Sequence, residues 1–413
     1  MTVAEKAKQM KEVSPLLAAS SNEMRNLALT KIKNSLREHS GDIFEANRQD
    51  LARAEADGLS APILKRLTFN EGKLQGVLDG IDSLLSLPDP LGRTLLHRQL
   101  DEGLELYRIS CPIGVIGVIF EARPDALVQI STLCIKSGNC ALLKGGSETR
   151  ETNRILFRLI YEAVLEAGLP EGCLVQAEER NEISELLECE GSVDLIIPRG
   201  SNSFVRHIMD HTTIPVMGHA DGVCHIYVAG DADKELALKL ITDAKTQYVS
   251  VCNAVESVLI DSSISKEFIP EFEAAMQKAH VEIHYTPENP HTEYLDYQIS
   301  AFTVDGIDEA IRHINRYGSH HTDCIITKDR SKAEYFMQLV DSANVYMNCS
   351  TRFADGFRYG FGAEVGISTG KLHARGPVGL EGLVTYKYKL FGNGQIVADY
   401  AEGRKKFDFR ELE

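Results

Sequence analysis

Positively charged residues are scarce in this 413-residue chain. Lys and Arg total 44 against 60 Asp and Glu, which gives a formal net charge of -16 at pH 7. Affinity for nucleic-acid phosphates requires clustered cations, so this balance argues against a general nucleic-acid-binding protein. It is still compatible with one local basic pocket for a small anionic ligand.

Paired cysteine motifs and long apolar runs are also lacking. The nine cysteines are scattered and form no CxxC pair. This predicts reduced thiols in a cytoplasmic protein, with no disulfide framework and no metal site. The first residues, MTVAEKAKQMKEV, contain no apolar signal segment, and the chain has no apolar run of about 18 residues. We therefore expect no contact with a membrane.

Alternating strand and helix patterns begin at residue 113, after helical segments at 2–57 and 71–87. IGVIGVIF (113–120) is continuously apolar, as in strands buried on both faces. Further strands are expected at 140–144, 173–178 and 193–198, with helices at 125–136, 149–168 and up to Leu187. This alternation predicts a doubly wound α/β architecture with a parallel sheet.

A second α/β set begins near residue 250, with strands at 254–260 and 323–327 and helices at 263–279, 306–317 and 331–341. We place a domain boundary near 248. The prediction is a Rossmann-type cofactor domain at 1–248 interrupted by a hairpin arm at 93–110, a catalytic domain at 249–370, and a segment at 371–413 that returns to the first domain and the arm.

Two isolated β-ribbon patterns lie far apart in the chain. Residues 93–110 read as a hairpin about Asp101-Glu102-Gly103, and residues 383–396 alternate tyrosine with lysine. Together they suggest an oligomerisation arm in a homo-oligomer. An edge strand within one protomer fits the pattern equally well.

Cys252 is the first candidate for chemistry, because it lies between the two α/β sets and just before a strand. Ligand sites collect between domains, and a thiol there can attack an acyl carbon. The alternative is a buried cysteine that acts as a small hydrophobic residue.

Two loops follow predicted strands of the first sheet, LLKGGSE (142–148) and IPRGS (197–201). Glycine in a strand-to-helix turn lets backbone N–H groups approach a phosphate, and the carboxyl edge of a parallel sheet is where ligands bind. Neither loop is a G-x-G-x-x-G or Walker A motif, so plain turns remain an alternative.

Three further groups of polar residues stand out. Glu121 and Arg123 follow a buried strand, where charges are costly unless solvated or used. The segment GKLHARGP (370–377) places cationic side chains at alternate positions and could bind an anion, or form a solvated edge. Several histidines near Asp323 resemble metal ligands, but their spacing fits no zinc pattern. They are His313, His320 and His321.

These segments together resemble the aldehyde dehydrogenase superfamily, and within it the γ-glutamyl phosphate reductase family. The stretch from Val304 to Ile325 looks like that family's long signature. IGVIGVIFEARPD (113–125), VCNAVE (251–256), STRFADG (350–356) and GKLHARGPVGLE (370–381) match in the expected order. The resemblance covers nearly the whole chain.

The resemblance implies NADPH-dependent reduction of L-glutamyl 5-phosphate to glutamate 5-semialdehyde with phosphate release, the second step of proline synthesis from glutamate. The substrate is a small molecule, and contact with the glutamate 5-kinase that makes it is a further expectation. The alternative is a related superfamily member that acts on another acyl phosphate or aldehyde.

The resemblance also implies roles for individual residues. Cys252 would be the nucleophile, and Arg123 stands where aldehyde-oxidising members have Asn, so that it could bind the oxyanion. The expected NADP ligands are Lys144, Ser147, Glu148, Arg199, Gly200, Ser201 and, by a looser match, Glu293. The expected ligands for phosphate or the substrate carboxylate are Lys371, His373 and Arg375.

One departure from the wider superfamily bears on the reaction. Aldehyde-oxidising members carry a water-activating Glu about thirty residues before the thiol, whereas the matching stretch here, residues 215–225, contains none. The absence favours acyl reduction over a hydrolytic aldehyde dehydrogenase. A non-catalytic partner protein is a second alternative, which the presence of Cys252 disfavours.

Overall fold

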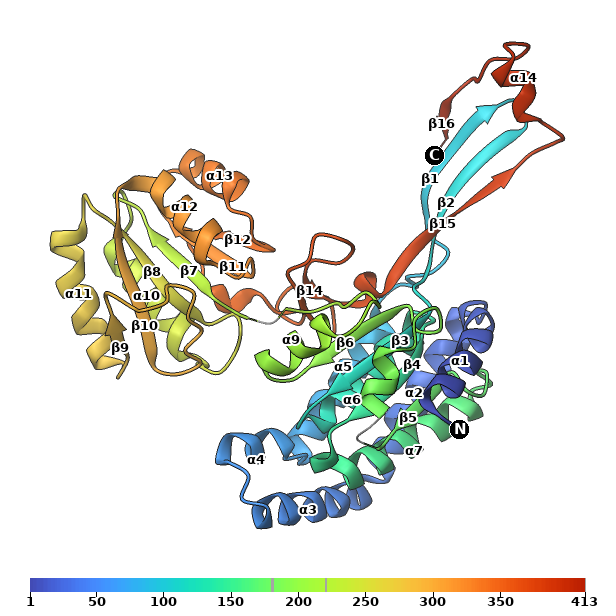
Figure 1. Cartoon of the computed structure of the whole chain (residues 1–413), viewed down its shortest axis with the longest axis horizontal. Helices are drawn as coiled ribbons and strands as arrows, with labels where there is room; N and C mark the ends of the chain where they lie inside the picture. Colours follow the sequence, from blue (N-terminus) through green and yellow to red (C-terminus); the bar gives the residue numbers. More distant parts are fainter. Residues whose placement is uncertain (180–181, 220, 413) are drawn as a thin grey trace. The chain divides into compact units, whose positions relative to one another are not determined.

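The computed structural model describes residues 1–179, 182–219 and 221–412 (Figure 1). It contains two compact units. The first comprises residues 1–217, 362–365 and 379–413, and the second comprises residues 218–361 and 366–378. Each unit is described by itself below.

The first unit begins with a helical layer: α1 (Val3–Ala18), α2 (Asn22–Glu38), α3 (Ser40–Ala56), α4 (Ala61–Leu67) and α5 (Glu71–Ser86). The expected helical region at 2–57 is therefore three helices. Side chains that accept hydrogen bonds from the first turn fix where several of them begin. Thr2 forms a capping box with Glu5, and Ser21 and Asn70 cap α2 and α5.

A parallel four-stranded sheet follows, with the order β5-β4-β3-β6. Its strands are β3 (Val115–Phe120), β4 (Cys140–Gly145), β5 (Leu174–Ala177) and β6 (Leu195–Arg199). The intervening helices are α6 (Pro124–Lys136), η1 (Ser147–Thr149), α7 (Arg150–Glu166) and α8 (Glu182–Leu187), and α9 (Asn202–Asp210) follows β6. All six residues of β3 are buried, as the continuous apolar run predicts. The strand order reverses between β3 and β6.

The two ribbon patterns pair with each other in one antiparallel sheet of order β15-β2-β1-β16, in which β1, β2 and β15 run side by side (Figure 1). The strands are β1 (Thr94–Asp101), β2 (Leu104–Pro112), β15 (Val384–Phe391) and β16 (Arg410–Leu412). The 3₁₀ turn η3 (Leu380–Leu383) precedes β15, and α14 (Val397–Ala401) follows it. The hairpin expected at 93–110 is present, whereas β16 was not expected.

The second unit contains a parallel six-stranded sheet of order β12-β11-β7-β8-β10-β9. Its strands are β7 (Cys224–Val228), β8 (Val255–Asp261), β9 (Glu282–His284), β10 (Gln298–Val304), β11 (Thr322–Ile326) and β12 (Asn344–Met347). The helices are α10 (Lys234–Thr246), α11 (Ser265–Lys278), α12 (Gly306–Tyr317) and α13 (Arg330–Leu339). The turn η2 (Thr351–Phe353) and the hairpin of β13 (Gly366–Ser368) and β14 (Gly376–Val378) complete it.

The division between the units lies at 217/218, not near 248. Strand β7 pairs with both β8 and β11, so the chain has already entered the second sheet at Cys224. The sequence analysis did not identify β7, and this omission moved the expected boundary to the next strand.

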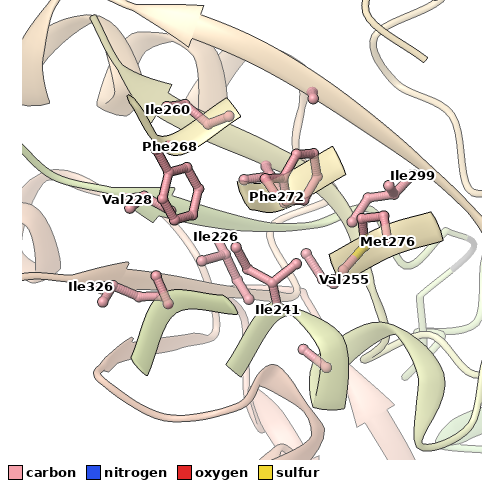
Figure 2. Packing of buried hydrophobic residues seen from close by; sticks show 14 of the residues in the cluster. Ile226, Val228, Ile241, Val255, Ile260, Phe268, Phe272, Met276, Ile299 and Ile326 are labelled. Carbon is pink, nitrogen blue, oxygen red and sulfur yellow. The ribbon is translucent and has the colours of Figure 1, made fainter. Parts of the chain in front are cut away.

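Two hydrophobic clusters hold the second sheet. Isoleucine and valine side chains from the strands meet Phe268, Phe272 and Met276 of α11 in the first cluster (Figure 2). Leu259, Ile325 and Phe336 belong to the second cluster. Both clusters are buried because a parallel sheet is covered on its two faces. Every helix in the described part of the chain is too short or too polar to span a lipid bilayer.

Leu259→Ala should lower the free energy of unfolding by about 2–5 kcal/mol, because it opens a cavity in a fully buried cluster. Leu339→Ala, at an exposed position on α13, should change it by less than about 0.5 kcal/mol. Urea denaturation followed by circular dichroism measures both. Equal effects of the two substitutions would contradict this assignment of the core.

Candidate active site

Cys252 lies in a loop that two hydrogen bonds join to the segment 350–356. It is half-buried and precedes β8. The side-chain amide of the neighbouring Asn253 donates to the carbonyl of Ala354 at 2.8 Å, and the hydroxyl of Thr351 donates to the carbonyl of Asn253 at 2.7 Å. The STRFADG segment thus fixes the backbone beside the thiol.

Gly222 packs directly against this loop. A Cβ atom at position 222 would lie 2.4 Å from the Cα of Cys252 and 2.3 Å from its carbonyl oxygen. Backbone atoms cannot rotate away as a side chain can, so only glycine fits here. The side chain of Cys224 approaches from the same strand end, where its thiol donates to the Cys252 carbonyl at 3.2 Å.

Two histidines stand beside the thiol. One ring nitrogen each of His219 and His321 and the sulfur of Cys252 all lie within 4.8 Å of one another. The Nδ1 of His219 donates to the carbonyl of Ile367 at 2.8 Å, and the Nδ1 of His321 lies 2.8 Å from the hydroxyl of Thr322. The Nε2 of His321 is buried without a hydrogen-bond partner among the described residues.

The three residues come together because each precedes a neighbouring parallel strand. His219 precedes β7, Cys252 precedes β8 and His321 precedes β11, and β7 lies between β8 and β11. Strands that run in parallel bring their amino ends to one edge. The sequence analysis singled out His321 only among unrelated histidines and gave His219 no role. Parallel pairing of strands far apart in sequence is the signal that it lacked.

Arg352 is a further polar residue of the site that the sequence analysis did not select. Its side chain is buried, and its Nε donates to the side-chain oxygen of Gln247 at 2.9 Å. Burial and the neighbouring Arg358 lower the pKa of Arg352, and the negative charge of a Cys252 thiolate raises it. The Arg352 guanidinium is therefore a cationic neighbour of Cys252.

A buried ion pair supports the loop that carries Glu293. Lys245 donates to Glu256 at 2.7 Å, and both side chains are fully buried. Burial raises the pKa of Glu256 to about 7, against the opposing effect of Lys245. The backbone N–H of Leu295 also donates to Glu256, and Ser250 donates to the carbonyl of Leu295. Glu293 therefore lies in a loop that is tied to the residues just before Cys252.

The cationic segment at 370–375 joins β13 to β14, next to the carbonyl of Ile367 that His219 contacts. Asp341 pairs with Lys371 at 2.6 Å and with Arg375 at 3.0 Å. The Lys371 ammonium and then the Arg375 guanidinium lower the pKa of Asp341. An incoming anion would compete with this carboxylate. His373 is exposed and has a left-handed φ of 64°.

The other histidines considered as metal ligands lie elsewhere. His313 packs against Phe302 and Tyr317, and burial lowers its pKa to about 4. The Nδ1 of His320 lies 2.6 Å from the carbonyl of Asp341. Of the three, only His321 reaches the thiol.

In the first unit, the two predicted loops flank the place where the strand order reverses. Crevices outside the carboxyl ends of parallel strands at such a point bind ligands. Glu121 follows β3 and accepts from the backbone N–H of Ser201 after β6, at 3.3 Å. A Cβ atom at Gly200 would lie 2.6 Å from the Glu121 carboxylate. Arg199 is half-buried at the end of β6.

The loop after β4 carries Lys144 and Glu148. Lys144 is buried, donates to the carbonyl of Gly145 at 2.7 Å, and has its pKa lowered by burial. Glu148 accepts a hydrogen bond from the backbone N–H of Ala122 at 2.6 Å. Its carboxylate lies so close to Gly146 that a Cβ atom at position 146 would clash with it. Ser147 is exposed in η1. Arg123 immediately precedes α6 in the first unit, whereas Cys252 belongs to the second unit.

Gly222→Ala should lower the free energy of unfolding by about 1–3 kcal/mol, because the added methyl group overpacks against the Cys252 backbone. Gly76→Ala is the matched control: Gly76 is an exposed position of α5 with open space around it, and the substitution should stabilise the protein by about 0.5–1 kcal/mol. Urea denaturation compares the two. A Gly222→Ala protein as stable as wild type would contradict the close approach.

Comparisons with known proteins identify the family of this chain. Residues 2–293 match the aldehyde dehydrogenase family. The chain is 58% identical to gamma-glutamyl phosphate reductase from Ruminiclostridium cellulolyticum over 96% of this chain and 95% of that protein. The same enzyme from Pelotomaculum thermopropionicum is 56% identical, over 100% of this chain and 98% of that protein.

A solved structure gives the same result. The crystal structure of gamma-glutamyl phosphate reductase from Thermotoga maritima matches with a TM-score of 0.93 at 36% identity, covering 96% of this chain and 100% of that one. The expected aldehyde-dehydrogenase-like α/β fold is confirmed. The chain therefore belongs to the aldehyde dehydrogenase family and, within it, to the gamma-glutamyl phosphate reductases.

Proposed function

We propose that the protein catalyses the NADPH-dependent reduction of L-glutamyl 5-phosphate to L-glutamate 5-semialdehyde, with release of phosphate, in proline biosynthesis. The observation that carries the proposal is a half-buried thiol, Cys252, on a rigid loop of a chain that is 58% identical to a reductase of this name. The two histidines and the guanidinium beside the sulfur are consistent with a reactive thiol.

The first stage is acyl transfer. The Cys252 thiolate attacks C5 of the acyl phosphate, the carbon–oxygen bond to the phosphate breaks, and a thioester forms. Backbone N–H groups at Cys252 and the Arg123 side chain are the proposed donors to the developing oxyanion. One such donor typically contributes about 3–4 kcal/mol to transition-state stabilisation.

The second stage is reduction of the thioester. NADPH, when bound, supplies the hydride that the thioester carbon accepts. Cys252 then departs as a thiolate while the carbonyl of the semialdehyde re-forms. Since residues 215–225 contain no glutamate to activate water, the thioester persists long enough to be reduced.

The first unit offers the groups that a dinucleotide requires. The parallel sheet reverses order between β3 and β6, and glycine occupies positions 146 and 200, where a Cβ atom would meet the carboxylates of Glu148 and Glu121. We propose that Lys144, Ser147 and Glu148 hold the adenosine ribose or its phosphate, and that Arg199, Gly200 and Ser201 lie beside the pyrophosphate. Glu293 is the proposed partner of the nicotinamide ribose.

Lys371, His373 and Arg375 are the proposed ligands of the substrate's phosphate or α-carboxylate. Two of the three already bind Asp341, so substrate binding would exchange one carboxylate for another anion. A local cationic segment matters here because a protein of net charge -16 otherwise repels an anionic substrate.

Two partners follow from the proposal. The antiparallel ribbon of β1, β2 and β15 exposes Tyr386, Tyr388 and Leu390, and we propose that it joins protomers of a homo-oligomer. Acyl phosphates hydrolyse readily, so contact with glutamate 5-kinase would shorten the substrate's path.

The reverse reaction tests the proposal. The protein should reduce NADP⁺ with glutamate 5-semialdehyde only when phosphate is present, and Cys252→Ser should abolish this turnover. Cys349→Ser, at another half-buried cysteine, is the control and should retain it. Absorbance of NADPH follows the reaction. Oxidation without phosphate would indicate a hydrolytic aldehyde dehydrogenase, and full activity of Cys252→Ser would exclude the covalent mechanism.

Lys144→Ala should raise the KM for NADPH by roughly tenfold or more, because a hydrogen bond to a charged group contributes about 1.5–3 kcal/mol. Steady-state kinetics with varied NADPH measures this. A fall in kcat alone, with KM unchanged, would contradict the assignment of Lys144 to cofactor binding.

A further inference from the structure

The group of His219, Cys252 and His321 has a composition that the proposed reduction does not require. It combines one thiol with two imidazoles, and its three donor atoms lie within 4.8 Å of one another. Sulfur and imidazole nitrogen are the ligands that Zn²⁺ prefers, and catalytic-type zinc sites use three protein ligands with one open position. Other half-buried cysteines, such as Cys349, belong to no such group among the described residues.

The hydrogen bonds of the two imidazoles also match those of metal ligands. A histidine that binds a metal usually donates its other ring N–H to a carbonyl or a similar acceptor, which fixes the tautomer. The Nδ1 of His219 contacts the carbonyl of Ile367, and that of His321 contacts the hydroxyl of Thr322. Nε2 is then the nitrogen through which each ring would bind.

The Nε2 atom of His321 is the second, independent observation. It is buried in a fully buried side chain and has no hydrogen-bond partner among the described residues. A buried polar atom without a partner is costly, and coordination of a metal would remove that cost. Cys224 contacts the opposite nitrogen, Nδ1, and its thiol is turned toward the Cys252 carbonyl.

We propose that His219, Cys252 and His321 form a binding site for Zn²⁺ that reversibly blocks the thiol. The Cys252 thiol releases its proton to solvent water and its sulfur binds the metal. The two Nε2 atoms bind beside it, and a water molecule completes a tetrahedron. Zn–S distances of about 2.3 Å and Zn–N distances of about 2.0 Å bring the donor atoms closer than 4.8 Å. The half-buried side chain of His219 must therefore move inward.

The block is expected to be reversible, because the metal and an incoming acyl group compete for the same sulfur atom. Zn²⁺ binding itself stands without the proposed function, whereas its effect on turnover rests on that function.

Co²⁺ titration of the full-length protein tests the site, because Co²⁺ takes the geometry of Zn²⁺ and gives a sulfur-to-metal charge-transfer band. Wild-type protein should show this band with one equivalent of Co²⁺, and Zn²⁺ should displace it. Cys252→Ser should abolish the band. His219→Ala and His321→Ala should each weaken Co²⁺ binding by more than roughly tenfold, because loss of a residue that only supports a metal ligand already lowers metal affinity by about that factor.

Two substitutions serve as controls. Cys349→Ser removes a half-buried thiol, and His207→Ala removes a histidine of the first unit, and both should leave the band unchanged. His321 is fully buried, so circular dichroism must show that His321→Ala is folded. If His321→Ala is unfolded, His219→Ala tests the site in its place, because the side chain of His219 is only half-buried.

The outcomes separate the two proposals. Absence of the band in wild type, a band that persists in Cys252→Ser, or unchanged affinity in His219→Ala would overturn the metal site. An intact band in a protein without reductase activity would overturn the proposed function and leave the site standing. Where activity is present, inhibition by Zn²⁺ that a chelator reverses supports both.

Discussion

The close approach of Gly222 to the backbone of Cys252 is the constraint on which the position of the candidate thiol depends. It brings the residues before β7 and β8 into van der Waals contact, where no side chain fits between them. Asn253 and Thr351 hold the same loop from the other side. The thiol is therefore positioned by backbone packing, and the side chains around it are left to adjust its reactivity.

The candidate residues of the two units lie at opposite edges of their sheets. In the first unit, the predicted cofactor loops follow strands, at the carboxyl edge where ligands usually bind. In the second, Cys252, His219 and His321 all precede strands, at the amino edge. The rule behind the prediction of Lys144 and Arg199 as cofactor ligands could not select the histidines, because it concerns the opposite edge of a sheet.

Much of the fold could be predicted from hydrophobic periodicity. The predicted helix at 306–317 is α12, and the long apolar run at 113–120 contains β3. Strand β7 was missed because five residues, CHIYV, are too few to distinguish a strand from a turn of buried helix. Cys252 was predicted to lie between the two α/β sets, but it lies within the second unit, in the loop between α10 and β8. The contacts of His219, His321 and Arg352 depend on strand pairing across tens of residues, which no local pattern contains.

The environment of the other cysteines shows what distinguishes Cys252. Burial raises the pKa of Cys134, Cys173 and Cys324 to about 12, so these thiols stay protonated at neutral pH. Cys252 instead combines partial exposure with two imidazoles and a nearby guanidinium. Accessibility and nitrogen neighbours are what an acyl substrate requires of a thiol, and a thiophilic metal requires the same. Sensitivity to Zn²⁺ is thus a physical consequence of how this thiol is held.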